Sequence, residues 1–144
     1  MRSTKLLAFT AVMAALANVM SVPPLAVPIQ IGGFTSAVHF FQLAIFLCGI
    51  LAGPVAGLIA GAVGGLYMSL TRIPFIVGGI AILGGSAGIF AKRVRPVIAS
   101  LLAFLVQTPY TLVTDYFWFT LFAPPKPFMS PLALITPIMI NLTL

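Results

Sequence analysis

Acidic residues are almost absent from this sequence, and charged side chains of both signs make up only 6% of its 144 residues. A soluble domain uses charged residues for about a quarter of its length, because water must solvate its surface. Hydrophobic residues make up 61% of the chain. This balance excludes an ordinary water-soluble domain. It predicts one polytopic integral membrane domain, residues 1–144, that lies in the lipid bilayer.

The chain also lacks the residue sets that catalytic and metal sites need. It has one acidic residue, one histidine and one cysteine, which cannot form a paired-carboxylate site or a multi-ligand metal site. No glycine-rich phosphate loop with its lysine occurs. We therefore expect no enzyme activity, no metal and no cofactor. Cys48, the only cysteine, cannot form an intrachain disulfide, and we interpret it as a small buried apolar side chain.

The net charge of +6 comes from cations that gather at the ends of apolar runs. Arg2 and Lys5 precede the first run, and residues 92–95 supply three more cations after the fourth. The positive-inside rule places these five in the cytoplasm and leaves Arg72 and Lys126 outside. We therefore expect a multi-pass protein with a cytoplasmic N-terminus. No basic stripe lies on a soluble face, so we expect no nucleic-acid binding.

Proline, glycine and charge divide the chain into six apolar segments. They predict an all-α fold, a compact bundle of six short transmembrane helices. The segments cover about residues 6–20, 37–51, 55–70, 75–90, 97–122 and 130 onward. Several are shorter than the roughly 20 residues of a perpendicular span. The sixth has only about 15 residues before Leu144, and we expect the natural chain to continue beyond it.

Small residues recur at a spacing of four in the first, third and fourth segments, the fourth through Gly84 and Gly88. In the third, Gly57, Gly61 and Gly65 form two overlapping steps, and such residues let another helix backbone approach closely. We interpret most of the glycines as packing within the bundle. The first segment presents Ala11 and Ala15 at the same spacing. Because alanine is common in any membrane helix, this pair alone does not specify a partner.

Three parts of the sequence resemble the substrate-binding S components of energy-coupling factor (ECF) transporters. They are the alanine-rich first segment, the proline- and glycine-containing connector after it, and residues 45–66. The resemblance covers about the first two-thirds of the chain. It implies a six-helix protein of a prokaryotic cytoplasmic membrane that binds a small water-soluble vitamin or vitamin precursor with high affinity. Ala11 and Ala15 match the Ala-x-x-x-Ala motif with which the family docks onto a transmembrane T component. Partner ATPase subunits would supply the energy.

The fifth segment carries the clearest candidate for a ligand site. At 100° per residue, Gln107, Thr111 and Asp115 fall within about an 80° arc that also contains Trp118. Tyr110 lies on the flank of this arc. A carboxylate in the membrane costs about 2.5–3.5 kcal/mol on insertion scales, so Asp115 should face a cavity or a cation. We expect this stripe to bind the ligand near the external surface.

Structural roles are the alternatives to ligand contact for each of these side chains. Asp115 also fits a structural ion pair with Arg72 or Lys126, and Trp118 fits an interfacial aromatic belt as well as a pocket. For a histidine in an apolar segment, a hydrogen-bonded structural role is the main alternative to ligand contact. Helix–helix hydrogen bonding is the alternative for a polar residue of the sixth segment. The further candidates for ligand contact are Tyr67, Arg72, Lys126, His39 and Asn141.

Two other classes of function compete with ligand uptake. A structural or assembly subunit of a membrane complex would use its small-residue grooves to bind other membrane proteins and would have no ligand. Stabilisation by a ligand separates this class from an S component. A proton-coupled exporter is less favoured, because Asp115 is the only carboxylate available to carry protons.

Overall fold

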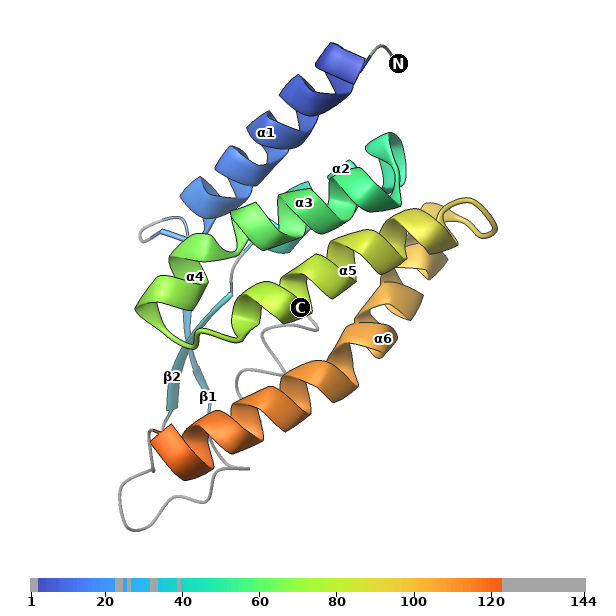
Figure 1. The fold of residues 1–144 in the computed structure, drawn as a ribbon. Coiled ribbons are helices and arrows are strands. Elements are labelled where there is room, and N and C mark those ends of the chain that lie inside the picture. The colour runs from blue at the N-terminus through green and yellow to red at the C-terminus, as the bar shows by residue number, and fades with distance from the viewer. Residues whose placement is uncertain (1–2, 23–24, 26, 32–33, 39, 123–144) are drawn as a thin grey trace.

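The computed structural model describes residues 3–22, 25, 27–31, 34–38 and 40–122. They form a helical bundle with a β-hairpin between the first two helices (Figure 1). The elements follow in the order α1 (Ser3–Met20), β1 (Val27–Ile31), β2 (Phe34–Val38), α2 (Phe41–Ala52), α3 (Pro54–Gly64), α4 (Leu66–Thr71), α5 (Ile76–Phe90), α6 (Pro96–Phe117) and the π-helical segment η1 (Trp118–Phe122).

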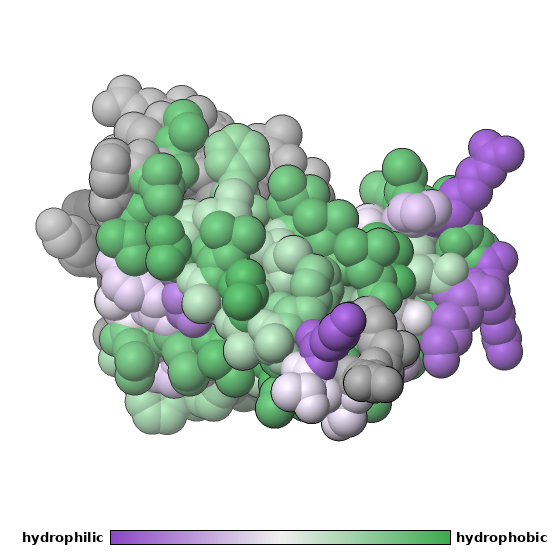
Figure 2. Space-filling model, turned by 90° about the horizontal axis from the view of Figure 1, so that it is seen from above, coloured by the Kyte–Doolittle hydropathy of each residue, from purple (hydrophilic) through white to green (hydrophobic). Residues whose placement is uncertain are grey.

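Three stretches are long and apolar enough to cross a membrane, namely Ser3–Met20, Pro54–Thr71 and Pro96–Phe122. Helices α2 and α5 are apolar but shorter. The face drawn in Figure 2 is apolar over most of its area, with hydrophilic residues mainly at one end. These features indicate a multi-pass membrane protein.

The prediction of an all-α bundle is confirmed, but the number of helices is not six in the described residues. There the chain forms five apolar helical stretches, of which three have the length of a membrane span. The sixth predicted segment, from residue 130, lies outside the described residues. The short stretches α2 and α5 are bounded by glycine, proline and charge, and this limits their length.

A hairpin replaces part of the predicted connector and the predicted start of the second helix. Strand β1 pairs antiparallel with β2, with Ile31 opposite Phe34, and helix α2 begins at Phe41 instead of Ala37. This register leaves two residues between the strands, and in the sequence these are glycines. Two-residue hairpin loops favour Gly-Gly. This pair between two short apolar runs was therefore a sequence signal for a hairpin, which the prediction of a connector and a helix missed.

Helices α2, α3 and α5 meet backbone to backbone through glycines. A Cβ atom on Gly57 of α3 would overlap the backbone of Gly84 of α5 and the Cα of Gly49 of α2. A Cβ on Gly84 would in turn overlap the carbonyl of Gly57. Because no side chain stands between them, the helices approach closely without help from a hydrophobic effect, which is weak between helices in lipid. Ile45 and Leu83 are fully buried in the bundle.

The third predicted segment is interrupted at Gly65, where α3 ends and α4 begins. In an unbroken helix the Tyr67 amide would donate to the Val63 carbonyl. Here the side chain of Asn18 from α1 takes both places. Its Nδ2 donates to Val63 O at 2.8 Å, and its Oδ1 accepts from the Tyr67 amide at 3.0 Å. A side chain inserted into the hydrogen-bond ladder is a known cause of helix kinks. The predicted third segment is therefore present as the apolar stretch Pro54–Thr71, with an interruption at Gly65 that the sequence did not predict.

Gly57→Ala should lower the melting temperature of the protein in detergent, at a cost of about 1–3 kcal/mol, because the new methyl group meets rigid backbone. Gly85→Ala is the matched control, since its Cβ would lie 3.4 Å from the Leu58 side chain, an ordinary contact. This control should melt at or slightly above the wild-type temperature, because alanine favours a helix over glycine. Equal losses in the two variants would contradict backbone contact at Gly57.

Candidate ligand-binding site

Gln107, Thr111 and Asp115 form one buried polar face of α6. Their exposed fractions are 2%, 6% and 1%, although they lie in a helix whose other faces carry exposed leucine and valine. The spacing of four residues places them one above another on the same side of the helix. The structure therefore turns this stripe into the bundle, away from the lipid-facing side of α6.

Two glycines of α5 make room for the polar stripe. A Cβ on Gly79 would lie 3.2 Å from Thr111 Oγ1 and 3.3 Å from Gln107 Nε2, and a Cβ on Gly78 would overlap the Tyr110 hydroxyl. The Tyr110 hydroxyl lies 3.4 Å from Phe75 O, to which it donates. The stripe thus packs against bare helix backbone. Sequence reasoning missed this pair, although adjacent glycines at the start of an apolar segment could have suggested a close approach.

Two acceptor atoms of the stripe have no hydrogen-bond partner among the residues that the structure describes. Among the described residues, no donor reaches the buried Gln107 Oε1 or the buried Asp115 Oδ2. Leaving a buried acceptor unpaired costs about 1–3 kcal/mol, and more when the group is charged. By contrast, the neighbouring Thr114 hydroxyl donates to Tyr110 O at 2.8 Å, within its own helix. Among the described residues, these two orphan atoms are therefore the buried acceptors of the stripe that have no donor.

Trp118 lies beyond Asp115, in a cluster of aromatic rings. Its indole meets the Phe75 ring edge to face at a centroid distance of 6.1 Å and stacks on Phe122 at 5.3 Å. The side chain is half-buried. Since Phe75 precedes α5, this contact and the Tyr110 hydrogen bond hold the start of α5 against the end of α6. The polar stripe is thus followed along the chain by a cluster of aromatic rings.

The other candidate residues are not gathered with Asp115. Arg72 is exposed at the end of α4, and among the described residues no ion pair joins it to Asp115. Tyr67 is half-buried on α4, where its backbone amide binds Asn18. The remaining candidates lie outside the described residues, and these are His39, Lys126 and Asn141.

Ala11 and Ala15 lie on the exposed face of α1. The buried face of this helix carries Thr10, Ala14 and Ala17. A Cβ on Gly64 would lie 2.8 Å from the Ala17 Cβ, so this second set of small residues makes the contact with α3. The Ala-x-x-x-Ala pair is therefore left free of packing within the described part of the bundle.

Comparisons of the chain with protein-family models, curated proteins and solved structures gave no match. Within the described part of the chain, no three side chains of His, Cys, Asp or Glu gather at one place. The polar stripe of α6 is thus the feature that points to a function.

Asp115→Asn should leave the melting temperature of the ligand-free protein unchanged or higher, because it removes a membrane charge that pairs with no described cation. Arg72→Gln should also leave it unchanged. Equal losses in these two variants would instead indicate an ion pair between Asp115 and Arg72. Equal losses in Asp115→Asn and Lys126→Gln would place the pair on Lys126.

Proposed function

We propose that this chain is the substrate-binding S component of an ECF-type uptake transporter, a membrane-embedded, high-affinity binder of a small water-soluble nutrient. The observation that carries the proposal is a pair of buried acceptors on α6, Gln107 Oε1 and Asp115 Oδ2, that have no partner among the described residues. Ionisable residues inside a membrane are costly and mark substrate or ion pathways. The resemblance of the first segment, the connector after it and residues 45–66 to S components supports the same assignment.

The chemistry of the site defines the group that its ligand presents. Both orphan atoms are acceptors, so the ligand supplies N–H or O–H donors, and a cationic group suits Asp115 best. The two acceptors are eight residues apart, about 12 Å along the helix axis, which requires two separate donors. The aromatic surface at Trp118 suits a flat or cationic ring. Asp115 is 1% exposed, so residues that cover it must move when a ligand reaches the carboxylate.

Energy for uptake would come from partner subunits. In the proposed assembly, a T component and ATPase subunits bind the S component in a prokaryotic cytoplasmic membrane, with the N-terminus of this chain on the cytoplasmic side. The exposed position of Ala11 and Ala15 supports docking through this pair, because small exposed residues let a partner helix approach closely. The same alanine face also favours a second candidate function, a structural subunit of a membrane complex that has no ligand.

The function is tested by mass spectrometry of small molecules that co-purify with the protein, followed by affinity measurements with the molecule found. Asp115→Asn should weaken binding about ten- to a hundred-fold, because it removes the charge-assisted part of a hydrogen bond worth roughly 1.5–3 kcal/mol. Thr114→Val is the matched control, since its hydroxyl already donates within α6, and it should bind normally. If no molecule co-purifies and no nutrient raises the melting temperature, the structural subunit is the better assignment.

Replacing both Ala11 and Ala15 with leucine should abolish co-purification of the chain with a T component, because the larger side chains prevent close helix approach. Ligand binding should persist, since both residues lie on the exposed face of α1, away from α6. Leu16→Phe enlarges another exposed residue of α1 and should leave assembly intact. Normal assembly of the double variant would remove the proposed docking face.

A further inference from the structure

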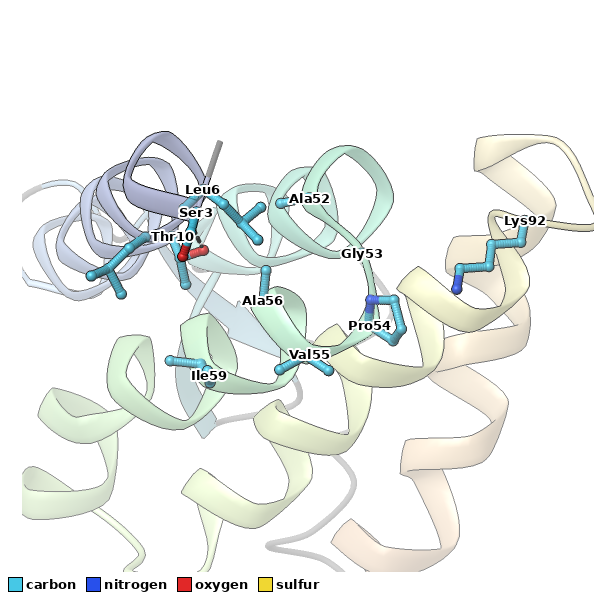
Figure 3. A pocket seen from close by; sticks show the side chains of 11 residues that line it. Ser3, Leu6, Thr10, Ala52, Gly53, Pro54, Val55, Ala56, Ile59 and Lys92 are labelled. Carbon is cyan, nitrogen blue, oxygen red and sulfur yellow. Dashed lines mark hydrogen bonds between the residues drawn. The ribbon is translucent and has the colours of Figure 1, made fainter. Parts of the chain in front are cut away.

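A groove of about 580 Å³ opens between the first half of α1 and the turn from α2 into α3 (Figure 3). Its walls are mostly aliphatic, and the ammonium group of Lys92 extends toward the turn at Pro54. The Thr10 hydroxyl in the α1 wall donates to Leu6 O at 2.8 Å, within its own helix. The residues that line the groove include Ser3, Leu6, Leu7, Val55, Ile59 and Lys92.

The groove follows from the way α1 is attached to the bundle. The contacts of α1 with α3 and α4 are tight near its C-terminal end, where Asn18 binds Val63 and Tyr67 and where Ala17 meets Gly64. From there α1 diverges from α3 toward its N-terminus (Figure 1). The small side chains Ala52 and Ala56 of the facing wall do not fill the space that this divergence leaves.

Positive charge gathers at the same end without a carboxylate to balance it. Lys5, Lys92, Arg93 and Arg95 are all exposed, and hydrophilic residues gather mainly at one end of the face in Figure 2. The whole chain has one acidic residue against seven cations. That residue, Asp115, is buried in α6. The balancing charge at this end must therefore come from another molecule.

We propose that the groove binds one anionic phospholipid, with its phosphate at Lys92 and an acyl chain along the aliphatic wall. The wall is open to the bilayer, because Leu7 and Val55 are 68% and 70% exposed. A soluble anion would use the cation but leave this apolar wall unoccupied, whereas a phospholipid fits both parts. This site is separate from the stripe on α6 and does not depend on the proposed nutrient.

The test is native mass spectrometry of the protein released from nanodiscs that contain equal amounts of phosphatidylglycerol and phosphatidylcholine with identical acyl chains. The wild-type protein should retain one phosphatidylglycerol in preference to phosphatidylcholine. Lys92→Gln should lower the affinity for phosphatidylglycerol about fivefold, the value of one lysine near a membrane surface. Ile59→Trp, which fills the groove without changing charge, should also lower retention.

Arg95→Gln is the matched control, because it removes one charge at the same end from a residue that does not line the groove. It should retain the lipid as the wild type does. Equal losses in Lys92→Gln and Arg95→Gln would overturn the site in favour of general surface charge. Equal retention of the two lipids, or displacement of phosphatidylglycerol by millimolar inorganic phosphate, would also overturn the proposal.

Discussion

Direct contact between helix backbones at glycine is the constraint on which the rest of this structure depends. Gly49, Gly57 and Gly84 bring α2, α3 and α5 together with no side chain between them. In lipid, apolar side chains gain little by leaving their surroundings, so close packing must supply the stability that burial supplies in water. Elsewhere glycines make room for side chains: Gly78 and Gly79 receive polar side chains of α6, and Gly64 receives the Ala17 methyl group of α1.

This packing explains how a polar stripe is tolerated in so apolar a chain. Since α5 presents glycines to α6, the Gln107 amide and the Thr111 hydroxyl fit against the α5 backbone and are shielded from lipid. A larger residue at Gly79 would push the stripe outward, where an unpaired carboxylate and amide are costly. The glycines therefore make room for Gln107 and Thr111, while Gln107 Oε1 and Asp115 Oδ2 remain without a described donor.

Features set by a single segment could be predicted from the sequence, whereas features set by contacts between two segments could not. Composition predicted the membrane class, and helical periodicity placed Gln107, Thr111 and Asp115 on one face, which is the buried face. The break at Gly65 was missed, because it requires Asn18 from a helix 45 residues away from Val63. Periodicity also could not tell which alanines of α1 face inward, since both sets are spaced for close packing.

Helix α1 shows how one element can serve two neighbours. The contacts of Asn18 and Ala17 fix its C-terminal half on α3 and α4. Leu6 and Phe9 pack its N-terminal half on a buried cluster that includes Cys48 and Ala56. The same half also has apolar and cationic surface that the described bundle leaves uncovered. A lipid in the groove would contact the N-terminal half of α1, whereas a partner at Ala11 and Ala15 would bind the exposed face in the middle of the helix. Because neither touches α6, changes at α1 should alter assembly without altering the chemistry at Asp115.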